Sequence, residues 1–316
     1  MTRDPLHPRA FSVTVAWTLV LLFLGSVVHA TESSLACPDW PTCYGTMMPD
    51  MEGGVFWEHL HRLVAGGLIL MFGLATWLAR KEAPERPWLF RVSLAGMALL
   101  LVQAAFGGLT VLLRLPDAVS TTHLALALLF LALATVLAAA ASPARLRREP
   151  IDDHARGRLR LWGGLATGAV FAQSLLGGVV RHMDAGMACP DVPTCVGRWI
   201  PPLVHPLITI HFAHRAFGIL VALLVVAMAV VVARRAAPHV TRTAFLAVAL
   251  VVTQVALGYA SVALKLAVAP VSLHTLVAAT LLTVTTLLAG WGWAGGGATR
   301  EREDVLEHAG TPGADL

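Results

Sequence analysis

The sequence predicts an all-α integral membrane protein: eight transmembrane helices that form two tandem four-helix bundles related by internal duplication. Composition gives the first reason for this fold. Hydrophobic residues make up 57% of the 316 residues and charged residues only 13%, which is too little polar surface to face water, so lipid is expected to surround the chain. Repetition gives the second reason, because cysteine and histidine motifs return about one half-length later.

Apolar segments of about 20 residues can cross a bilayer as helices. The expected helices cover residues 11–30, 57–79, 89–112, 119–141, 160–180, 207–233, 241–264 and 270–293. Alternating strand patterns are missing, and helices satisfy their own backbone groups in lipid. The chain is expected to consist of an N-terminal half at residues 1–141, a cytoplasmic linker at 142–159, a C-terminal half at 160–293 and a disordered cytoplasmic tail at 294–316.

The first apolar segment has two interpretations. Its basic start and the small-residue stretch Val28-His-Ala30 resemble a signal peptide with a cleavage site. However, Gly25-Ser-Val-Val matches Gly177-Gly-Val-Val in the fifth expected helix, which cannot be removed. The first segment is therefore expected to stay in the protein as a helix.

Basic residues orient the predicted bundle. Most of them lie in three connections, at residues 80–91, 142–160 and 234–242, which the positive-inside rule places in the cytoplasm together with both termini. A multi-pass protein of the cell membrane is predicted, with the opposite loops on the outer, periplasmic side. The net charge of +4 implies no nucleic-acid partner, because the excess lies where cytoplasmic loops meet anionic membrane lipid.

Two cysteine pairs lie in the predicted outer loops. Cys37-Pro-Asp-Trp-Pro-Thr-Cys43 returns as Cys189-Pro-Asp-Val-Pro-Thr-Cys195. The short spacing and the oxidising outer compartment favour a small disulfide loop in each half. Each bridge could be purely structural, and a redox role is the alternative for Cys37 and Cys43. A zinc site made of all four thiolates would require the two loops to converge.

Four histidines recur at matched depths in the predicted helices: His61, His123, His214 and His274. Two imidazoles at similar height on alternate helices of each half are the arrangement that bis-histidine ligation of a haem b requires. Covalent haem attachment is not expected, because the chain has no Cys-x-x-Cys-His motif. The alternative is that these histidines form hydrogen bonds between helices.

The two halves differ next to the first histidine. Glu58-His-Leu-His61-Arg62 corresponds to His211-Phe-Ala-His214-Arg215. Glu58 precedes His61 by three residues, so both lie on one helix face. A carboxylate there could accept a proton or stabilise positive charge on a bound macrocycle, and the alternative is an interfacial ion pair with Arg62 or another arginine. The difference favours separate tasks for the two halves.

Glu-x-x-His-Arg in the second expected helix, His-Arg in the sixth, single histidines in the fourth and eighth, and the outer cysteine loops together resemble the haem A synthases, membrane oxygenases that act on haem O. The resemblance covers about residues 11–293. It implies that His214 and His274 hold a haem b cofactor, and that haem O binds near His61 and His123. It also implies that Glu58 assists oxidation of a haem methyl group to a formyl group through hydroxylation, for cytochrome oxidase maturation. A haem O synthase and an electron donor are the further partners, and a homo-oligomer is compatible with the sequence.

One departure concerns the first outer loop, where the family pattern has an arginine and this chain has His29, whereas the second half keeps Arg181. Since arginine suits carboxylates better than histidine, haem propionates would be held differently in the first half. Three further histidines, His59, His182 and His205, are expected to be solvated.

The motif Gln-x-x-x-Gly occurs at Gln103, Gln173 and Gln254, where helix packing is the expected role and contact with haem the alternative. Two other functional classes remain open for the whole chain. A di-haem b electron carrier would use the same histidines but would not need Glu58. A quinone-linked thiol oxidoreductase would use the outer cysteines and leave the histidines without a role.

Overall fold

The computed structural model describes residues 5–141, 151–234 and 236–293, and within these ranges the regular structure is helical apart from two isolated β-bridges. Eight helices in the described part are long and apolar enough to cross a membrane. Seven of them are α1 (His7–Ala30), α2 (Gly53–Glu82), α3 (Pro87–Leu112), α4 (Asp117–Ala141), α8 (Pro206–Ala233), α9 (Pro238–Ala263) and α10 (Val268–Trp293). The prediction of an all-α protein with eight transmembrane helices is confirmed.

The remaining span, Asp153–His182, is built from α6 (Asp153–Arg158), a π-helical turn (Leu159–Gly163) and α7 (Gly164–His182). It begins at Asp153 instead of residue 160, inside the predicted linker. The reason is local, because the side chain of Asp152 accepts a hydrogen bond from the backbone N–H of Ala155 and so caps the new first turn. Most of the linker, residues 142–150, and the tail predicted to be disordered, 294–316, lie outside the described residues.

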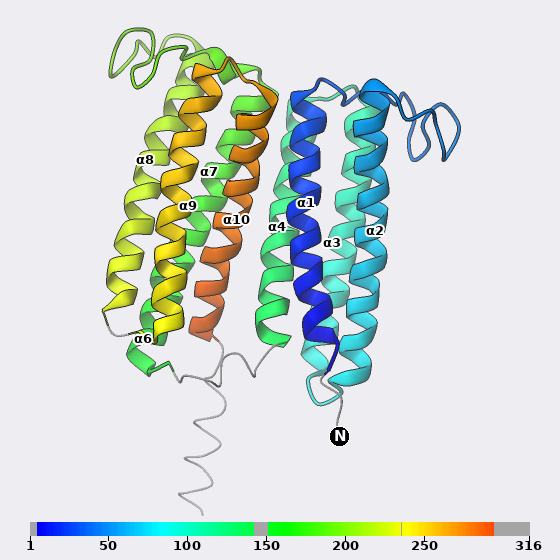
Figure 1. Ribbon diagram of the computed structural model, residues 1–316, viewed down its shortest axis with the longest axis vertical. Coiled ribbons are helices and arrows are strands. Elements are labelled where there is room, and N and C mark those ends of the chain that lie inside the picture. The colour runs from blue at the N-terminus through cyan, green and yellow to red at the C-terminus, as the bar shows by residue number, and fades with distance from the viewer. Residues whose placement is uncertain (1–4, 142–150, 235, 294–316) are drawn as a thin grey trace, which may run out of the picture.

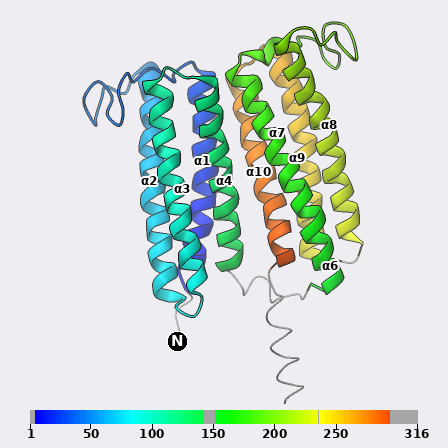
Figure 2. The same cartoon turned by 180° about the vertical axis from the view of Figure 1, so that it is seen from behind.

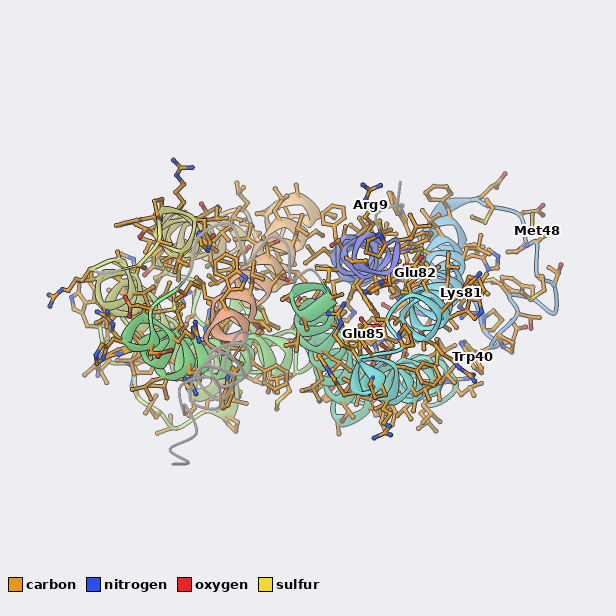
Figure 3. The ribbon with its side chains drawn as sticks, turned by 90° about the horizontal axis from the view of Figure 1, so that it is seen from below. Arg9, Trp40, Met48, Lys81, Glu82 and Glu85 are labelled. Carbon is orange, nitrogen blue, oxygen red and sulfur yellow. A yellow bond between two sulfur atoms is a disulfide. The ribbon has the colours of Figure 1, made fainter. Side chains whose placement is uncertain are left out.

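The helices form two groups of four that stand side by side. Figures 1 and 2 show α1–α4 in one group and α7–α10 in the other, and the view from below separates the two groups clearly (Figure 3). Helices α1 and α4 meet α10, and α4 also meets α7, so these four elements form the seam. The internal duplication, and the assignment of different tasks to residues 1–141 and 160–293, stay predictions.

Each group has its own apolar core. One cluster of buried residues belongs entirely to α1–α4 and the short segment after α2, with Phe11, Phe72 and Phe130 at its centre. The other cluster fills α6–α10 and extends across the seam to Leu22 of α1 and to Leu128 and Leu131 of α4. The two groups are therefore packed against each other through a shared cluster of buried apolar residues.

The two ends of the molecule differ. Both cysteine loops lie at the end opposite to the N-terminus, one on each outer flank (Figure 1). At the N-terminal end, Glu82 of α2, which Figure 3 labels, accepts hydrogen bonds from the backbone N–H groups of Leu6 and His7; the distances are 2.7 and 2.9 Å. This contact fixes the start of α1 against the end of α2. The predicted cytoplasmic position of this end stays a prediction.

Candidate functional site

Four histidines occupy matching places near the end that carries the cysteine loops. Each lies within about the first three turns of a transmembrane helix that starts at this end (Figure 1). They are His61 on α2, His123 on α4, His214 on α8 and His274 on α10, and all four are partly exposed. His61 interacts electrostatically with His123, and His214 with His274. Each four-helix group therefore contains one pair of neighbouring imidazoles.

A glycine of the preceding helix lies against each of these rings. The contacts are Gly25 with His61, Gly107 with His123, Gly177 with His214 and Gly258 with His274. A Cβ atom added to any of these glycines would lie 2.9–3.1 Å from the Cε1 atom of the facing histidine. This is closer than carbon atoms pack, so each imidazole keeps its place because the facing residue has no side chain.

The backbone of the preceding helix fixes the tautomer of two of the four histidines. Nδ1 of His123 lies 3.1 Å from the carbonyl oxygen of Gln103, and Nδ1 of His274 lies 3.0 Å from the carbonyl oxygen of Gln254. A carbonyl oxygen only accepts, so Nδ1 must donate and Nε2 keeps its lone pair. An imidazole held in this way is the usual form of a metal-ligating histidine, and these residues therefore fit a haem iron.

His214 is held differently. The side-chain Nε2 of Gln173 donates to the carbonyl oxygen of His214 at 2.9 Å and lies 3.1 Å from its Nδ1. Nδ1 accepts in this arrangement, so Nε2 carries the proton. Iron ligation through Nε2 requires the other tautomer, with the proton on Nδ1, and requires Gln173 to turn its Oε1 atom towards Nδ1 to accept from it. That oxygen is buried and has no hydrogen-bond partner among the described residues, so it is free to take this role.

Of the four histidines, His61 has the least support from hydrogen bonds. Its Nδ1 atom is buried and has no hydrogen-bond partner within the described ranges. The reason is visible in α1, where Leu21 precedes Gly25 by four residues, the place that Gln173 takes before Gly177 in α7. An aliphatic side chain can neither donate to an imidazole nor accept from it. The two histidine pairs therefore share their glycine contacts but differ in hydrogen bonding.

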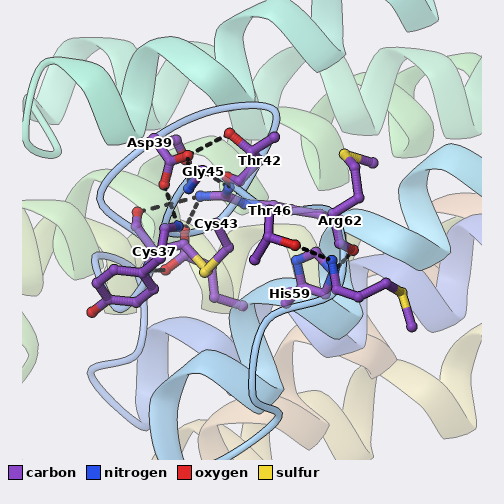
Figure 4. Close-up of a disulfide and its surroundings, with 12 residues drawn as sticks. Cys37, Asp39, Thr42, Cys43, Gly45, Thr46, His59 and Arg62 are labelled. Atoms are coloured by element: carbon purple, nitrogen blue, oxygen red, sulfur yellow. Dashed lines mark hydrogen bonds and ion pairs between the residues drawn. A yellow bond between two sulfur atoms is a disulfide. The ribbon is translucent and has the colours of Figure 1, made fainter.

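Glu58 joins the helix of His61 to the first cysteine loop. It is 4% exposed, pairs through Oε1 with Nη2 of Arg62, and accepts a 2.8 Å hydrogen bond from the backbone N–H of Cys37 on Oε2. Arg62 also donates to the carbonyl oxygens of Asp39 and Thr42 (Figure 4). The ion pair with Arg62, named above as the alternative interpretation of Glu58, is thus present in the structure.

The second half repeats the arginine contact and replaces the carboxylate. Arg215 donates through Nη1 to the carbonyl oxygens of Asp191 and Thr194, both at 2.8 Å, and through Nε to His211 at 3.0 Å. His211 in turn donates through Nδ1 to the carbonyl oxygen of Ala185 at 2.8 Å. The sequence signal for these loop contacts is the repeated His-Arg dipeptide, which suggested an ion pair for Arg62 but no contact of either arginine with a loop carbonyl.

Both cysteine pairs form disulfides, Cys37–Cys43 with a Cα–Cα distance of 4.8 Å and Cys189–Cys195 with 4.6 Å. The two loops lie on opposite flanks of the molecule (Figure 1). The convergence that a zinc site of all four thiolates would need is therefore not present.

The expectation of solvated imidazoles is wrong for His59 and His182. His59 is 2% exposed and lies 3.0 Å through Nε2 from the carbonyl oxygen of Met47. His182 lies at the seam, where its Nδ1 is 2.9 Å from the hydroxyl of Thr121 and its ring meets the ring of His29 edge-on. A loop-adjacent position did not reveal that the loop folds back over His59 and that α4 covers His182. His205 is exposed as expected, and caps α8.

Comparison with known proteins identifies the family of this chain. The family described as cytochrome oxidase assembly protein, COX15-CtaA, matches residues 9–286. A protein of Symbiobacterium thermophilum named heme A synthase is 34% identical over 78% of this chain and 83% of the relative. Proteins with the same name from Shewanella oneidensis and Caulobacter vibrioides are each 28% identical, over 87% and 88% of this chain and 93% of each relative. The chain therefore belongs to the COX15-CtaA family of cytochrome oxidase assembly proteins.

Proposed function

We propose that this protein is a haem A synthase, which oxidises a methyl group of haem O to a formyl group through hydroxylation and uses haem b as its cofactor. One observation carries the proposal: two histidine pairs stand at equal depth in a chain of this family, and a carboxylate accompanies only the N-terminal pair. The names of the relatives support the same activity. The product would serve cytochrome oxidase maturation.

The C-terminal pair is the proposed cofactor site. His274 is fixed by the carbonyl oxygen of Gln254 and presents Nε2, and His214 is held by the amide of Gln173. When bound between them, haem b supplies one-electron redox chemistry. The chain contributes the two ligands and the glycine contacts that keep each ring in place.

The N-terminal pair is the proposed site for the substrate, haem O. His123 is held by the carbonyl oxygen of Gln103, as in the cofactor half, whereas Nδ1 of His61 has no such partner among the described residues. A ligand without this support is the easier one to displace. The first half can therefore exchange its haem more readily, which a substrate site requires and a cofactor site does not.

Glu58 is the proposed catalytic residue of the first half. Its spacing of three residues places it on the same face of α2 as His61. Arg62 and the N–H of Cys37 use one lone pair on each of its oxygens, and a carboxylate has further lone pairs to offer. Glu58 then accepts a proton, or stabilises positive charge, beside the reacting macrocycle.

The proposed orientation follows the basic loops. Both termini face the cytoplasm, and both disulfide loops face the outer side of the cell membrane. An electron donor and a haem O synthase are the proposed partners beside membrane lipid, and a homo-oligomer is compatible with the lipid-facing surface.

Haem extraction after expression tests the proposal. Purified protein from cells that make haem O should release haem b together with haem O or its hydroxylated and formylated products, and His214→Met or His274→Met should remove or alter the low-spin haem b spectrum. Haem b alone, under conditions that supply haem O, would favour an electron carrier. No haem, with thiol oxidation coupled to quinone, would favour the oxidoreductase.

A further inference from the structure

The region around the first disulfide, called here the corner, contains a third side chain with metal-binding chemistry beside Cys37 and Cys43, the imidazole of His59. The sulfur atoms of Cys37 and Cys43 and a ring nitrogen of His59 all lie within 4.8 Å of one another. The two cysteines are fully buried and His59 is 2% exposed. Figure 4 shows the disulfide, His59 and Arg62 together under the loop. Sulfur and imidazole are the donors that soft and borderline-soft cations prefer in proteins.

His59 is already oriented as a metal ligand would be. Its Nε2 lies 3.0 Å from the carbonyl oxygen of Met47, which only accepts, so Nε2 donates and Nδ1 keeps its lone pair. Nδ1 is buried and finds no hydrogen-bond partner in the described part of the chain. A buried imidazole nitrogen without a partner costs free energy, and a second nitrogen that donates to a backbone carbonyl is the usual outer contact of a ligating histidine.

The second half offers a natural comparison. Phe212 takes the place of His59 two residues before the histidine of its helix, and within the described residues the disulfide Cys189–Cys195 has no third ligand of this kind. Among the described residues, Cys37, Cys43 and His59 form such a group of three side chains. The feature is therefore not a by-product of the loop fold, since both loops share that fold.

We propose that reduction of the Cys37–Cys43 disulfide converts this corner into a three-ligand site for a soft or borderline-soft cation, such as Zn²⁺ or Cu⁺. An external dithiol would supply two electrons and two protons, becoming a disulfide itself and leaving two thiols on the loop. The cation then displaces both thiol protons and binds two thiolates and Nδ1 of His59. The oxidised loop has no thiolate to offer, so the site exists only in the reduced state.

The geometry needs little rearrangement. Metal bonds of about 2.0–2.3 Å place neighbouring ligand atoms roughly 3.5 Å apart, so His59 moves inward slightly while the freed sulfur atoms separate. Arg62 lies beside the site and donates to the carbonyl oxygens of Asp39 and Thr42, which keeps the loop closed after the covalent bridge is gone.

Metal titration of the full-length holoprotein tests this proposal. The background variant Cys189→Ser/Cys195→Ser removes the second pair, and a phosphine reductant opens the first, taking its oxygen from water to become a phosphine oxide. Zn²⁺, and in a second experiment Cu⁺, is then titrated in competition with a chromophoric chelator. We expect one ion per chain in the reduced protein and none at this site before reduction.

The matched variant is His59→Phe, which copies Phe212. It should weaken the binding of the ion by at least about 10-fold, and His59→Cys should restore it by supplying a third thiolate. Equal affinity in the His59→Phe variant, or no binding by the reduced background protein, would overturn the proposal. Haem content and spectrum, measured in the same samples, report on folding and on the proposed synthase activity separately from the metal site.

Discussion

At the scale of single residues, the four histidines share a steric frame and differ in hydrogen bonding. Glycines press against all four rings, but the support of Nδ1 comes from a backbone carbonyl for His123 and His274, from a side-chain amide for His214, and from no described residue for His61. A backbone carbonyl group stays in place whatever side chain its residue carries. The support of His214 therefore depends on one side chain, whereas that of His274 does not.

This difference predicts unequal effects of two glutamine variants. Gln173→Leu should weaken haem b binding by about 10- to 100-fold, because it removes the hydrogen-bonding partner of a ligand. Gln254→Leu is the matched control, since its backbone carbonyl still receives Nδ1 of His274. Haem b retention during dialysis against apomyoglobin measures the effect. Equal losses in the two variants would show that the glutamines act through packing.

Replacing Glu58 with Gln tests the proposed catalytic carboxylate. The amide keeps the size and can still accept from the N–H of Cys37, but it cannot offset the charge of Arg62. Product formation should fall by about 100-fold or more while haem b content stays near normal. Extracted haem products and haem b per protein are measured together.

The control for that variant is needed because breaking a buried ion pair can cost about 3–5 kcal/mol of stability. His211 occupies the equivalent place in the second half, so His211→Gln disturbs the loop contact there and should alter the haem b spectrum more than the chemistry of the first site. Full haem A production by Glu58→Gln would show that Glu58 is not catalytic and serves only in the ion pair with Arg62.

At the scale of elements, the helices were predictable from the sequence because a helix that crosses lipid needs a long, nearly uninterrupted apolar segment. The expected ends differ from the observed ones by a few residues, and the largest difference is the added turn of α6 at Asp153. Loop contacts were not predictable, since no periodicity reports which carbonyl oxygens a buried guanidinium will reach. The roles of Arg62 and Arg215, and the burial of His59, depend on how each cysteine loop folds back over its helix.

The first cysteine loop has a built-in sensitivity to acid. Asp39 accepts hydrogen bonds from the hydroxyl of Thr42 and from the backbone N–H groups of Gly45 and Tyr44, and these contacts, Thr42 first, lower the pKa of its carboxyl group. A lowered folded-state pKa means that Asp39 stabilises the loop fully above its unfolded pKa of about 3.9. This contribution is lost as the pH falls through the folded-state pKa.

Reduction of the buried disulfides measures that loss. As the pH falls below about 3.9, the unfolded-state pKa of Asp39, the rate at which a phosphine reduces Cys37–Cys43 should rise relative to the rate for Cys189–Cys195 in the same molecules, because both bridges are buried and must open to be reached. Asp39→Asn should remove the pH dependence of this ratio. A constant ratio in the unmodified protein would show that Asp39 does not hold the loop closed.

At the scale of the whole molecule, polar contacts join the two helix groups near the level of the histidines. Nη2 of Arg181 donates to the carbonyl oxygen of His29 at 2.9 Å, and the hydroxyls of Ser26 and Thr275 lie 3.0 Å apart. The sequence singled out His29 as a departure from the arginine expected there, but did not show that the arginine of the second half reaches across the seam to it. A sequence motif within one half does not indicate which residues of the other half it will contact.

The orientation of this assembly in the membrane is predicted by charge alone and can be measured with its own cysteines. Basic residues gather in the connections opposite the disulfide loops, so both loops should face outward. In intact spheroplasts, a membrane-impermeant maleimide should label neither pair before reduction and both pairs after reduction with an impermeant phosphine, since all four cysteines are disulfide-bonded. A cysteine introduced into the α2–α3 connection, as Glu85→Cys in a background with all four cysteines changed to serine, should react only after the membrane is permeabilised. Labelling of Glu85→Cys in sealed spheroplasts would invert the topology and would place both histidine pairs near the cytoplasmic surface.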